Sequence, residues 1–202
     1  IVVLSSMRVV NIAQDDKRGR RFRDDQGNWH KETDVVKCTA AHSSNWELAC
    51  AKLGELHIES MNISMCGLTP EGLPSLADAI KVMAVVDEMN VSMNPIGVDG
   101  AKALAEVLPE SSLKCLIIGP KSTRLPVNDA EVTELNFEGQ EFTPTEVTLV
   151  AKAISTMAVV NSLTLDMNGI FGELYLDGSV KEVDMFASEC DAFFAALKGS
   201  NI

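Results

Sequence analysis

A repeat with a period near 28 residues constrains the fold of this 202-residue chain more than any other feature of its sequence. Residues 58–68 (IESMNISMCGL) and 86–96 (VDEMNVSMNPI) share one pattern of apolar positions and start 28 residues apart. The pattern recurs four more times, twice in weaker form, so that copies begin at Met7, Ile58, Val86, Leu113, Val132 and Val160. Self-similarity at a fixed period predicts a stack of similar units that share one core.

Helical patterns fill the stretches between the copies. Residues 97–108 carry apolar side chains at helical spacing, namely Ala101, Leu104, Ala105 and Leu108. Thr69-Pro70-Glu71 and Thr143-Pro144 are typical helix starts, because Thr caps a helix and Pro suits its first turn. Each unit is therefore predicted to be a short strand, a turn and a helix, which makes the fold class α/β with parallel strands.

These units resemble the leucine-rich repeat family, in its helix-containing, ribonuclease-inhibitor-like class of 28 residues. The resemblance implies a solenoid, a horseshoe arc with parallel strands inside and helices outside. It also implies that one slot of each unit, held by Asn or Cys, turns the chain and bonds to the backbone of neighbouring units. Asn94, Asn168 and Cys66 occupy this slot, and Asn94 is expected to be buried; Asp15 and Gln140 depart from the pattern.

One leucine-rich repeat domain is expected over residues 1–202, interrupted by two insertions at about 14–37 and 171–186. The second insertion is predicted to hold a small hairpin, because Asp177-Gly178 is a turn sequence. Further helices are predicted over 44–53 and 188–199. The half-repeat at about 113–131 carries two prolines where a helix belongs, so an irregular crossover is expected there. Because both ends interrupt a unit, the chain is interpreted as a piece of a longer array.

Composition narrows the classes of function. The net charge of −12 argues against a nucleic-acid partner, which requires a basic surface, and no apolar run is long enough for a transmembrane segment. The five scattered cysteines favour reduced thiols in an intracellular protein. No nucleotide-binding, metalloprotease or hydrolase motif occurs, so neither a cofactor nor an enzymatic activity is expected. His30, Cys38, His42 and Cys50 are candidate zinc ligands, but their spacing fits no finger, and core thiols and loop histidines explain them better.

The exposed slots of the predicted strands are mainly acidic. Strand residues alternate between faces, so the slots between the apolar positions point toward the concave side of the predicted arc. Four asparagines share the middle slot among the six copies, and six of eight charged residues in the flanking slots are acidic. The candidate partner-binding residues are Glu59, Asn62, Asp87, Glu88, Asn90, Glu134, Asn136, Glu138 and Asp166. Solubility alone would also account for polar residues in exposed slots.

The insertions provide a second set of candidate contacts. Residues 1–57 hold nine basic and eight acidic residues, whereas residues 58–202 hold eight basic and 21 acidic ones. The basic charge is concentrated in KRGRRFR (17–23), which suits an anionic surface or an acidic partner, although neighbouring aspartates could equally make it a solvated loop. The candidate insertion contacts are Lys17, Arg18, Arg20, Arg21, Arg23, Trp29 and Tyr175.

Three hypotheses of function follow. The first is a non-catalytic module that binds a protein with a basic contact surface through an acidic concave face. The second is a structural or peripheral subunit of a large multi-protein assembly, held through the insertions. The third is a regulator of an enzyme, because the resembled family includes nuclease inhibitors and an activator of the Ran GTPase.

Overall fold

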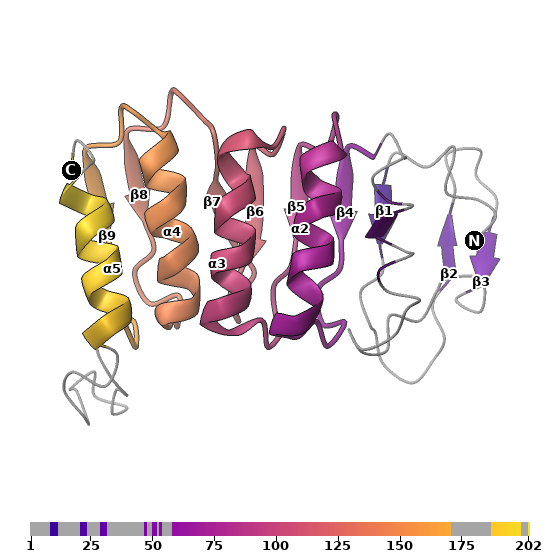
Figure 1. Ribbon diagram of the computed structural model, residues 1–202, viewed down its shortest axis with the longest axis horizontal. Helices are drawn as coiled ribbons and strands as arrows, with labels where there is room; N and C mark the ends of the chain where they lie inside the picture. Colours follow the sequence, from indigo (N-terminus) through magenta and orange to yellow (C-terminus); the bar gives the residue numbers. More distant parts are fainter. Residues whose placement is uncertain are drawn as a thin grey trace.

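The computed structural model describes residues 58–170 and 187–198, the short strands at 9–11, 21–23 and 29–31, and positions 47, 50, 51, 53 and 202. Helices form one layer and strands form the other, and from residue 60 onward the elements of each layer lie side by side in chain order (Figure 1). The helices are α2 (Leu73–Val82), α3 (Gly97–Val107), α4 (Pro144–Thr156) and α5 (Ala187–Lys198), with 3₁₀ turns η3 (Pro70–Gly72) and η4 (Leu108–Glu110). The expected mixed α/β class is thereby confirmed.

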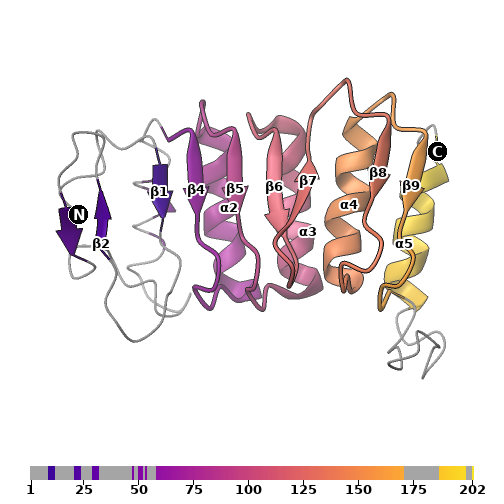
Figure 2. The same cartoon turned by 180° about the vertical axis from the view of Figure 1, so that it is seen from behind.

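The strands form three groups. The largest sheet has the order β1 (Val9–Asn11), β4 (Ser60–Asn62), β5 (Glu88–Asn90), β6 (Cys115–Ile118) and β7 (Thr123–Pro126). A second pair joins β8 (Glu134–Asn136) to β9 (Ser162–Thr164), in parallel. A third pair, antiparallel, joins β2 (Arg21–Arg23) to β3 (Trp29–Lys31) inside the first predicted insertion. Figure 2 shows the strand layer from its outer side.

The sequence period and the strand register coincide. Ser60 pairs with Glu88, and Glu134 pairs with Ser162, each 28 residues further along the chain. Val9 pairs with Ser60 and Glu88 pairs with Cys115, at the 51- and 27-residue spacings of the repeat. All these pairs are parallel, so the chain must cross back over the sheet between paired strands. Helices α2, α3 and α4 make this crossover between β4 and β5, between β5 and β6, and between β8 and β9.

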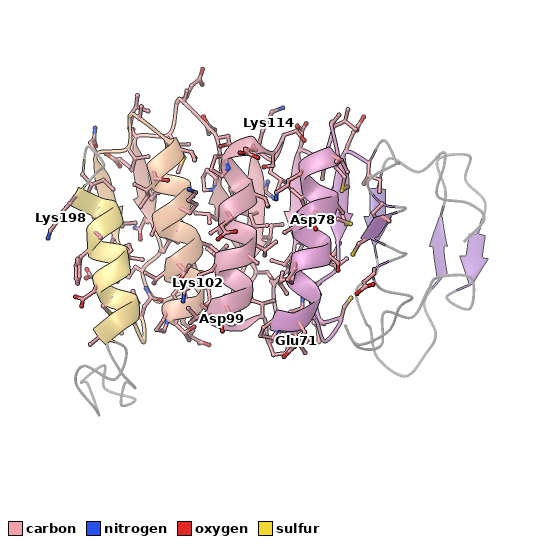
Figure 3. All side chains as sticks on the ribbon, in the orientation of Figure 1. Glu71, Asp78, Asp99, Lys102, Lys114 and Lys198 are labelled. Carbon is pink, nitrogen blue, oxygen red and sulfur yellow. The ribbon has the colours of Figure 1, made fainter. Side chains whose placement is uncertain are left out.

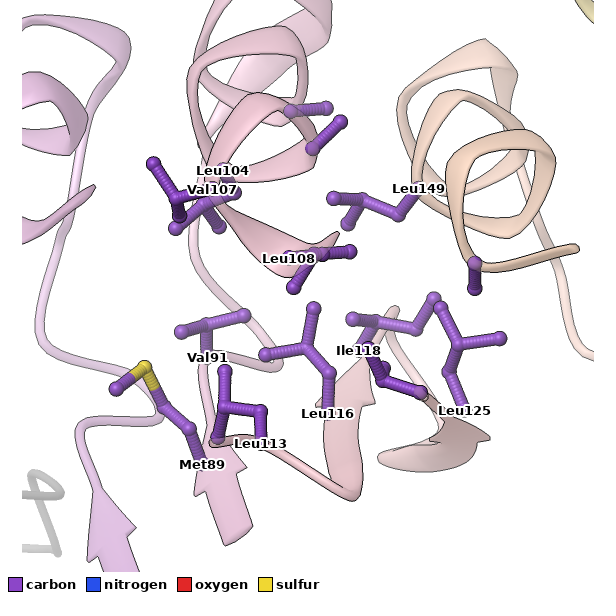
Figure 4. Close-up of a cluster of buried hydrophobic side chains, with 14 of the residues drawn as sticks. Met89, Val91, Leu104, Val107, Leu108, Leu113, Leu116, Ile118, Leu125 and Leu149 are labelled. Atoms are coloured by element: carbon purple, nitrogen blue, oxygen red, sulfur yellow. The ribbon is translucent and has the colours of Figure 1, made fainter. Parts of the chain in front are cut away.

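The core lies between the two layers. On the strand side, the central residues Met61, Met89 and Leu116 are fully buried and lie in one row of the sheet. On the helix side, Ala101, Leu104, Ala105 and Leu108 are buried, as the helical spacing predicts. Figure 4 shows how Leu104, Leu108 and Leu149 of the helix layer meet Leu116 and Leu125 of the strand layer. A unit alone would leave this apolar surface in water, so each unit depends on its neighbours.

The half-repeat at 113–131 differs from the prediction. Instead of an irregular crossover, β7 turns back and pairs antiparallel with β6, with Ile117 opposite Arg124. Gly119 and Ser122 form the turn, both at positive φ (71° and 53°). Leu125 and Val127 alternate with outward residues and are fully buried, so the segment has the period of a strand.

The β6–β7 hairpin changes how the two layers match in width. Neighbouring strands lie about 4.8 Å apart, whereas packed helices lie about 8–10 Å apart. One strand per helix would force the layers to curve. Helix α3 packs directly against α4, but the strand layer carries both β6 and β7 beneath them. Two strands are about as wide as one helix, so the layers are matched in width at this point.

Two similar Thr-Pro sequences begin helices in different ways. Thr143 caps α4: its hydroxyl accepts from the Thr145 amide, and the Glu146 carboxylate accepts from the Thr143 amide at 2.9 Å. Thr69 instead precedes η3, makes no side-chain capping bond, and buries an unpaired hydroxyl oxygen. Because Pro70 opens a 3₁₀ turn, α2 itself begins only at Leu73, three residues later than the sequence pattern suggests.

Asn94 and Asn168 make the same hydrogen bonds in two different units. The Asn94 amide donates to the carbonyls of Ile63, Val91 and Ser92, and the Asn168 amide donates to those of Phe137, Leu165 and Asp166. The Asn94 oxygen accepts from Cys66 and Leu68 of the preceding unit, and the Asn168 oxygen accepts from Phe142. Each asparagine thus joins two successive units. Asn168 is buried, but Asn94 is only half-buried, contrary to expectation.

The slot also holds Cys66 and Gln140. The Cys66 thiol donates to the Ser64 carbonyl at 3.4 Å, and the Gln140 amide donates to the Glu138 carbonyl at 3.1 Å. Both side chains therefore bond to the carbonyl two residues earlier in the chain, as Asn94 and Asn168 also do. Gln140 adds a bond from the Thr123 hydroxyl at 2.6 Å, which links the β6–β7 hairpin to the next unit. Asp15 lies outside the described residues.

Candidate functional site

The candidate site is the open face of the strand layer, which we define as the sheet surface turned away from the helices (Figure 2). Its residues alternate along each strand with the buried ones. One row of the sheet holds Ser60, Glu88 and Cys115, and the next holds Asn62, Asn90 and Ile117. On the β8–β9 pair, the corresponding positions are Glu134, Asn136, Ser162 and Thr164.

The asparagines of the open face end their strands with local bonds. The Asn62 oxygen accepts from the Ser64 amide at 3.0 Å and from its hydroxyl at 2.8 Å. Asn90 does the same with Ser92, and Asn136 accepts from the Glu138 amide. No hydrogen bond to another described residue occupies their side-chain N–H groups. The open face therefore presents amide donors in adjacent units.

Two of the predicted acidic residues are paired with cations. Glu88 accepts from Arg124 at 2.6 Å, and Asp87 lies 2.9 Å from the Lys114 ammonium. Sequence reasoning placed Lys114 on this face but missed Arg124, because residues 119–129 were assigned to a crossover. The alternating pattern of Leu125 and Val127 was the signal that could have revealed the strand. These pairs neutralise much of the acidic charge of Asp87 and Glu88.

Arg124 reaches over strand β6 to bind Glu88. It starts from β7, opposite Ile117, and its partner lies on β5, opposite Cys115. Ile117, on the open face, is nevertheless buried. Burial raises the pKa of the Cys115 thiol; the Arg124 charge opposes this shift and the Glu88 charge adds to it. The hydrogen bond to Glu88 raises the pKa of Arg124, so the guanidinium remains charged.

Glu134, Glu138 and Asp166 form the acidic part of the open face that has no paired cation among the described residues. All three side chains are exposed. Glu134 lies on β8, and the other two lie in the loops that follow β8 and β9, where the Gly139 amide donates to the Asp166 carbonyl at 2.8 Å. We call these three residues the acidic cluster. Glu59 is also exposed, but it lies at the start of β4, away from this cluster.

The candidate contacts in the insertions are only partly described. Strand pairing places Arg23 opposite Trp29 and Arg21 opposite Lys31. Sequence reasoning did not predict this hairpin. Lys17, Arg18, Arg20 and Tyr175 lie outside the described residues, as does the hairpin predicted at 171–186.

Metal ligands, thiols and apolar helices are the other features of the described residues that bear on function. Within those residues, no group of three or more His, Cys, Asp or Glu residues is arranged to hold a metal ion; Cys38 and His42 fall outside them. Cys50 and Cys190 are buried, and Cys66 and Cys115 are half-buried. No helix in the described ranges combines the length and apolar character needed to cross a membrane. Comparisons with models of protein families and with curated proteins found no match.

Proposed function

We propose that this chain is a leucine-rich repeat arc that binds a basic protein through the open face of its strand layer. The repeat assignment is supported by the equality of the sequence period and the parallel register, 28 residues in two separate strand pairs. The shared bonding of Asn94 and Asn168 supports it further, because both side chains link one unit to the next. This proposed architecture provides a broad, preformed surface and no chemistry of its own.

The acidic cluster is the observation that carries the binding proposal. The three exposed carboxylates belong to two neighbouring parallel units: Glu134 and Glu138 follow one another on the β8 unit, and Asp166 lies on the β9 unit, joined to the first by the bond from the Gly139 amide to the Asp166 carbonyl at 2.8 Å. Their fields therefore add and favour a partner with Lys and Arg on its contact surface. The unoccupied amide donor of Asn136 lies beside them and suits a carbonyl or hydroxyl of the partner.

Charge reversal tests this proposal. We choose the triple variant Glu134→Lys, Glu138→Lys and Asp166→Lys, and we measure binding of a lysine-rich helical peptide at low and high salt. The expected result is a loss of at least about tenfold in association rate at low salt, and a smaller loss at high salt, because screening removes long-range attraction. The fold should persist, since these side chains are exposed.

A matched control separates this surface from net charge. Asp78, Glu106 and Asp191 are exposed acidic residues of the helix layer, and replacing them with Lys changes the net charge by the same amount. This control should retain most of the wild-type binding. Equal losses in both triple variants would mean that only net charge matters, and would count against the open face. Unchanged binding in both variants would indicate that the insertions bind the partner instead, as expected for a subunit of a larger assembly.

A further inference from the structure

Three exposed methionines share one position in three units. Met65, Met93 and Met167 each precede the slot residue that follows β4, β5 and β9, and their exposed fractions are 49%, 48% and 61%. All three have positive φ angles of 54°, 57° and 59°. The unit that contains β8 has Gly139 at this position, at φ 62°. We call Met65, Met93 and Met167 the methionine edge; it lies at the carboxyl ends of the parallel strands.

Neither the backbone conformation nor packing in the core explains why methionine occupies this position. A positive φ costs an ordinary L-residue about 1–2 kcal/mol, and glycine, as at Gly139, avoids that cost. The side chains are not used in the core, where Met61, Met83, Met89 and Met157 are buried. A strained backbone position that repeatedly exposes a large apolar side chain is explained by contact with something outside the chain.

Backbone hydrogen bonds and close contacts fix the positions of the methionine edge residues. The Met65 amide donates to the Ser92 carbonyl at 3.2 Å, and the Met93 amide donates to the Gly119 carbonyl at 3.3 Å. These bonds continue the sheet ladder past the ends of the strands, so Met65 and Met93 lie in adjacent units. Gly139 lies beside Met167, because a side chain at Gly139 would meet the Met167 Cβ at 4.0 Å. The apolar groups are therefore aligned along one edge.

Acidic residues surround this edge. Glu138 and Asp166 of the acidic cluster lie in the same loops, and Glu141 follows at positive φ. The helices also begin at this edge, where Figure 3 shows Glu71 and Asp99, whereas Lys114 lies at the opposite edge. Two of these acids are paired, since Lys102 lies 3.6 Å from Asp99 and Lys121 lies 3.1 Å from Glu141, so Glu138 and Asp166 provide the acidic charge that no described cation offsets. An apolar row with acidic borders complements a ligand with an apolar stripe and basic borders.

We infer that the methionine edge binds the apolar face of a basic amphipathic helix, which belongs to the protein partner. This inference rests on the proposed function and adds a second part to the same site. Methionine suits the task, because its flexible, polarizable side chain adapts to apolar helices of varied sequence. From β4 to β9 the edge spans at least about 24 Å, the length of about 16 helical residues.

Methionine oxidation provides the test. The probe is a helical peptide of about 18 residues with leucine along one face and lysine on the other, long enough to span the edge. The companion probe has glutamine in place of every leucine and keeps all the lysines. Mild peroxide treatment of the free protein should convert Met65, Met93 and Met167 to sulfoxides, while Met61, Met83, Met89 and Met157 serve as internal buried controls. Peptide mass spectrometry measures each site.

The double variant Met65→Gly and Met93→Gly provides an independent measurement, because glycine suits the backbone angles at both positions. It should bind the leucine–lysine peptide at least about tenfold more weakly, as expected for two lost apolar contacts. The matched control is Val85→Thr with Val159→Thr, two exposed apolar residues at the other end of the strands, and it should bind like the wild type.

The outcomes separate the two claims. Protection of the three exposed methionines by the leucine–lysine peptide alone supports the inference. Binding of both peptides without protection, or unchanged affinity of the glycine variant, overturns it and leaves the proposed function standing. Failure of both peptides to bind overturns both claims. Protection that survives charge reversal of the acidic cluster supports the methionine edge and rejects the electrostatic part of the proposed function.

Discussion

The side-chain amide of Asn94 donates to the main-chain carbonyl of Ile63 at 2.9 Å, across 31 residues of sequence. Asn168 makes the corresponding bond to Phe137 at 2.7 Å, again across 31 residues. Asparagine is suited to this role because it offers both donors and an acceptor on a short side chain. One side chain thereby satisfies backbone groups on both sides of a junction between units.

Asn94→Ala should destabilise the protein by about 1–3 kcal/mol, because it leaves several partly buried backbone groups without partners. The free energy of unfolding from chemical denaturation measures this loss. Asn161→Ala is the control: its side chain is exposed and makes no hydrogen bond with the described residues, so a change below about 0.5 kcal/mol is expected. Equal stability of the two variants would contradict the structural role of Asn94.

The Cys115 thiol should react slowly with an alkylating reagent at neutral pH. Only the thiolate is nucleophilic, and burial raises the pKa of Cys115, so less thiolate exists at a given pH. A plot of its alkylation rate against pH should have its midpoint above that of cysteine in an unfolded peptide. Arg124→Gln removes a cation that favours the thiolate and should move the midpoint higher.

Glu88→Gln provides the opposite control for the same thiol, because the Glu88 carboxylate raises the pKa of Cys115. Its midpoint should be lower than in the wild-type protein. Site-resolved mass spectrometry distinguishes Cys115 from the other cysteines. A shift in the same direction for both variants would show that Arg124 and Glu88 do not act on the thiol through their charges.

The same substitution should have different effects at the two Thr-Pro helix starts. Thr143→Val removes the capping bond of α4 and should cost about 1 kcal/mol of stability. Thr69→Val removes a buried hydroxyl that has no partner, so stability should stay unchanged or rise by up to about 1 kcal/mol. Thermal or chemical unfolding measures the stability of the two variants. A comparable loss of stability at both positions would contradict the claim that only Thr143 caps its helix.

The repeat made most of the strand order predictable. Because each copy begins with the same apolar pattern, its period determines the register, as in the pairing of Met61 with Met89. The β6–β7 hairpin was not predictable from the period, since it interrupts the repeat. Local alternation at Leu125 and Val127 indicates the extra strand only once the expectation of an irregular crossover is set aside.

The charge of the candidate site was less predictable than its position. The slot pattern identifies Glu88 as outward-facing, but its neutralisation depends on Arg124, which comes from a segment outside the repeat. The positive φ angles at Met65 and Met93 could not be predicted from the sequence either, because glycine and asparagine are the residues that usually adopt such angles. Residues that break local preference are the ones that only the structure could single out.

Replacing Met93 with Gly should leave the fold as stable as before, or stabilise it by up to about 1 kcal/mol. Relief from the positive φ of 57° contributes about 1–2 kcal/mol, and the greater freedom of glycine in the unfolded chain offsets about 0.5–1 kcal/mol of it. Few apolar contacts are lost, since the side chain is 48% exposed.

Met89→Gly is the control for this substitution, because Met89 is fully buried four residues earlier, in β5. It creates a cavity in the core and should cost at least about 3 kcal/mol. Chemical denaturation of both variants compares the two costs. A similar loss at Met93 would mean that its side chain stabilises the fold, and selection for binding would no longer be needed to explain it. Preserved stability together with weaker binding of the leucine–lysine peptide would instead assign Met93 to recognition, because the side chain would then contribute to binding and not to the stability of the fold.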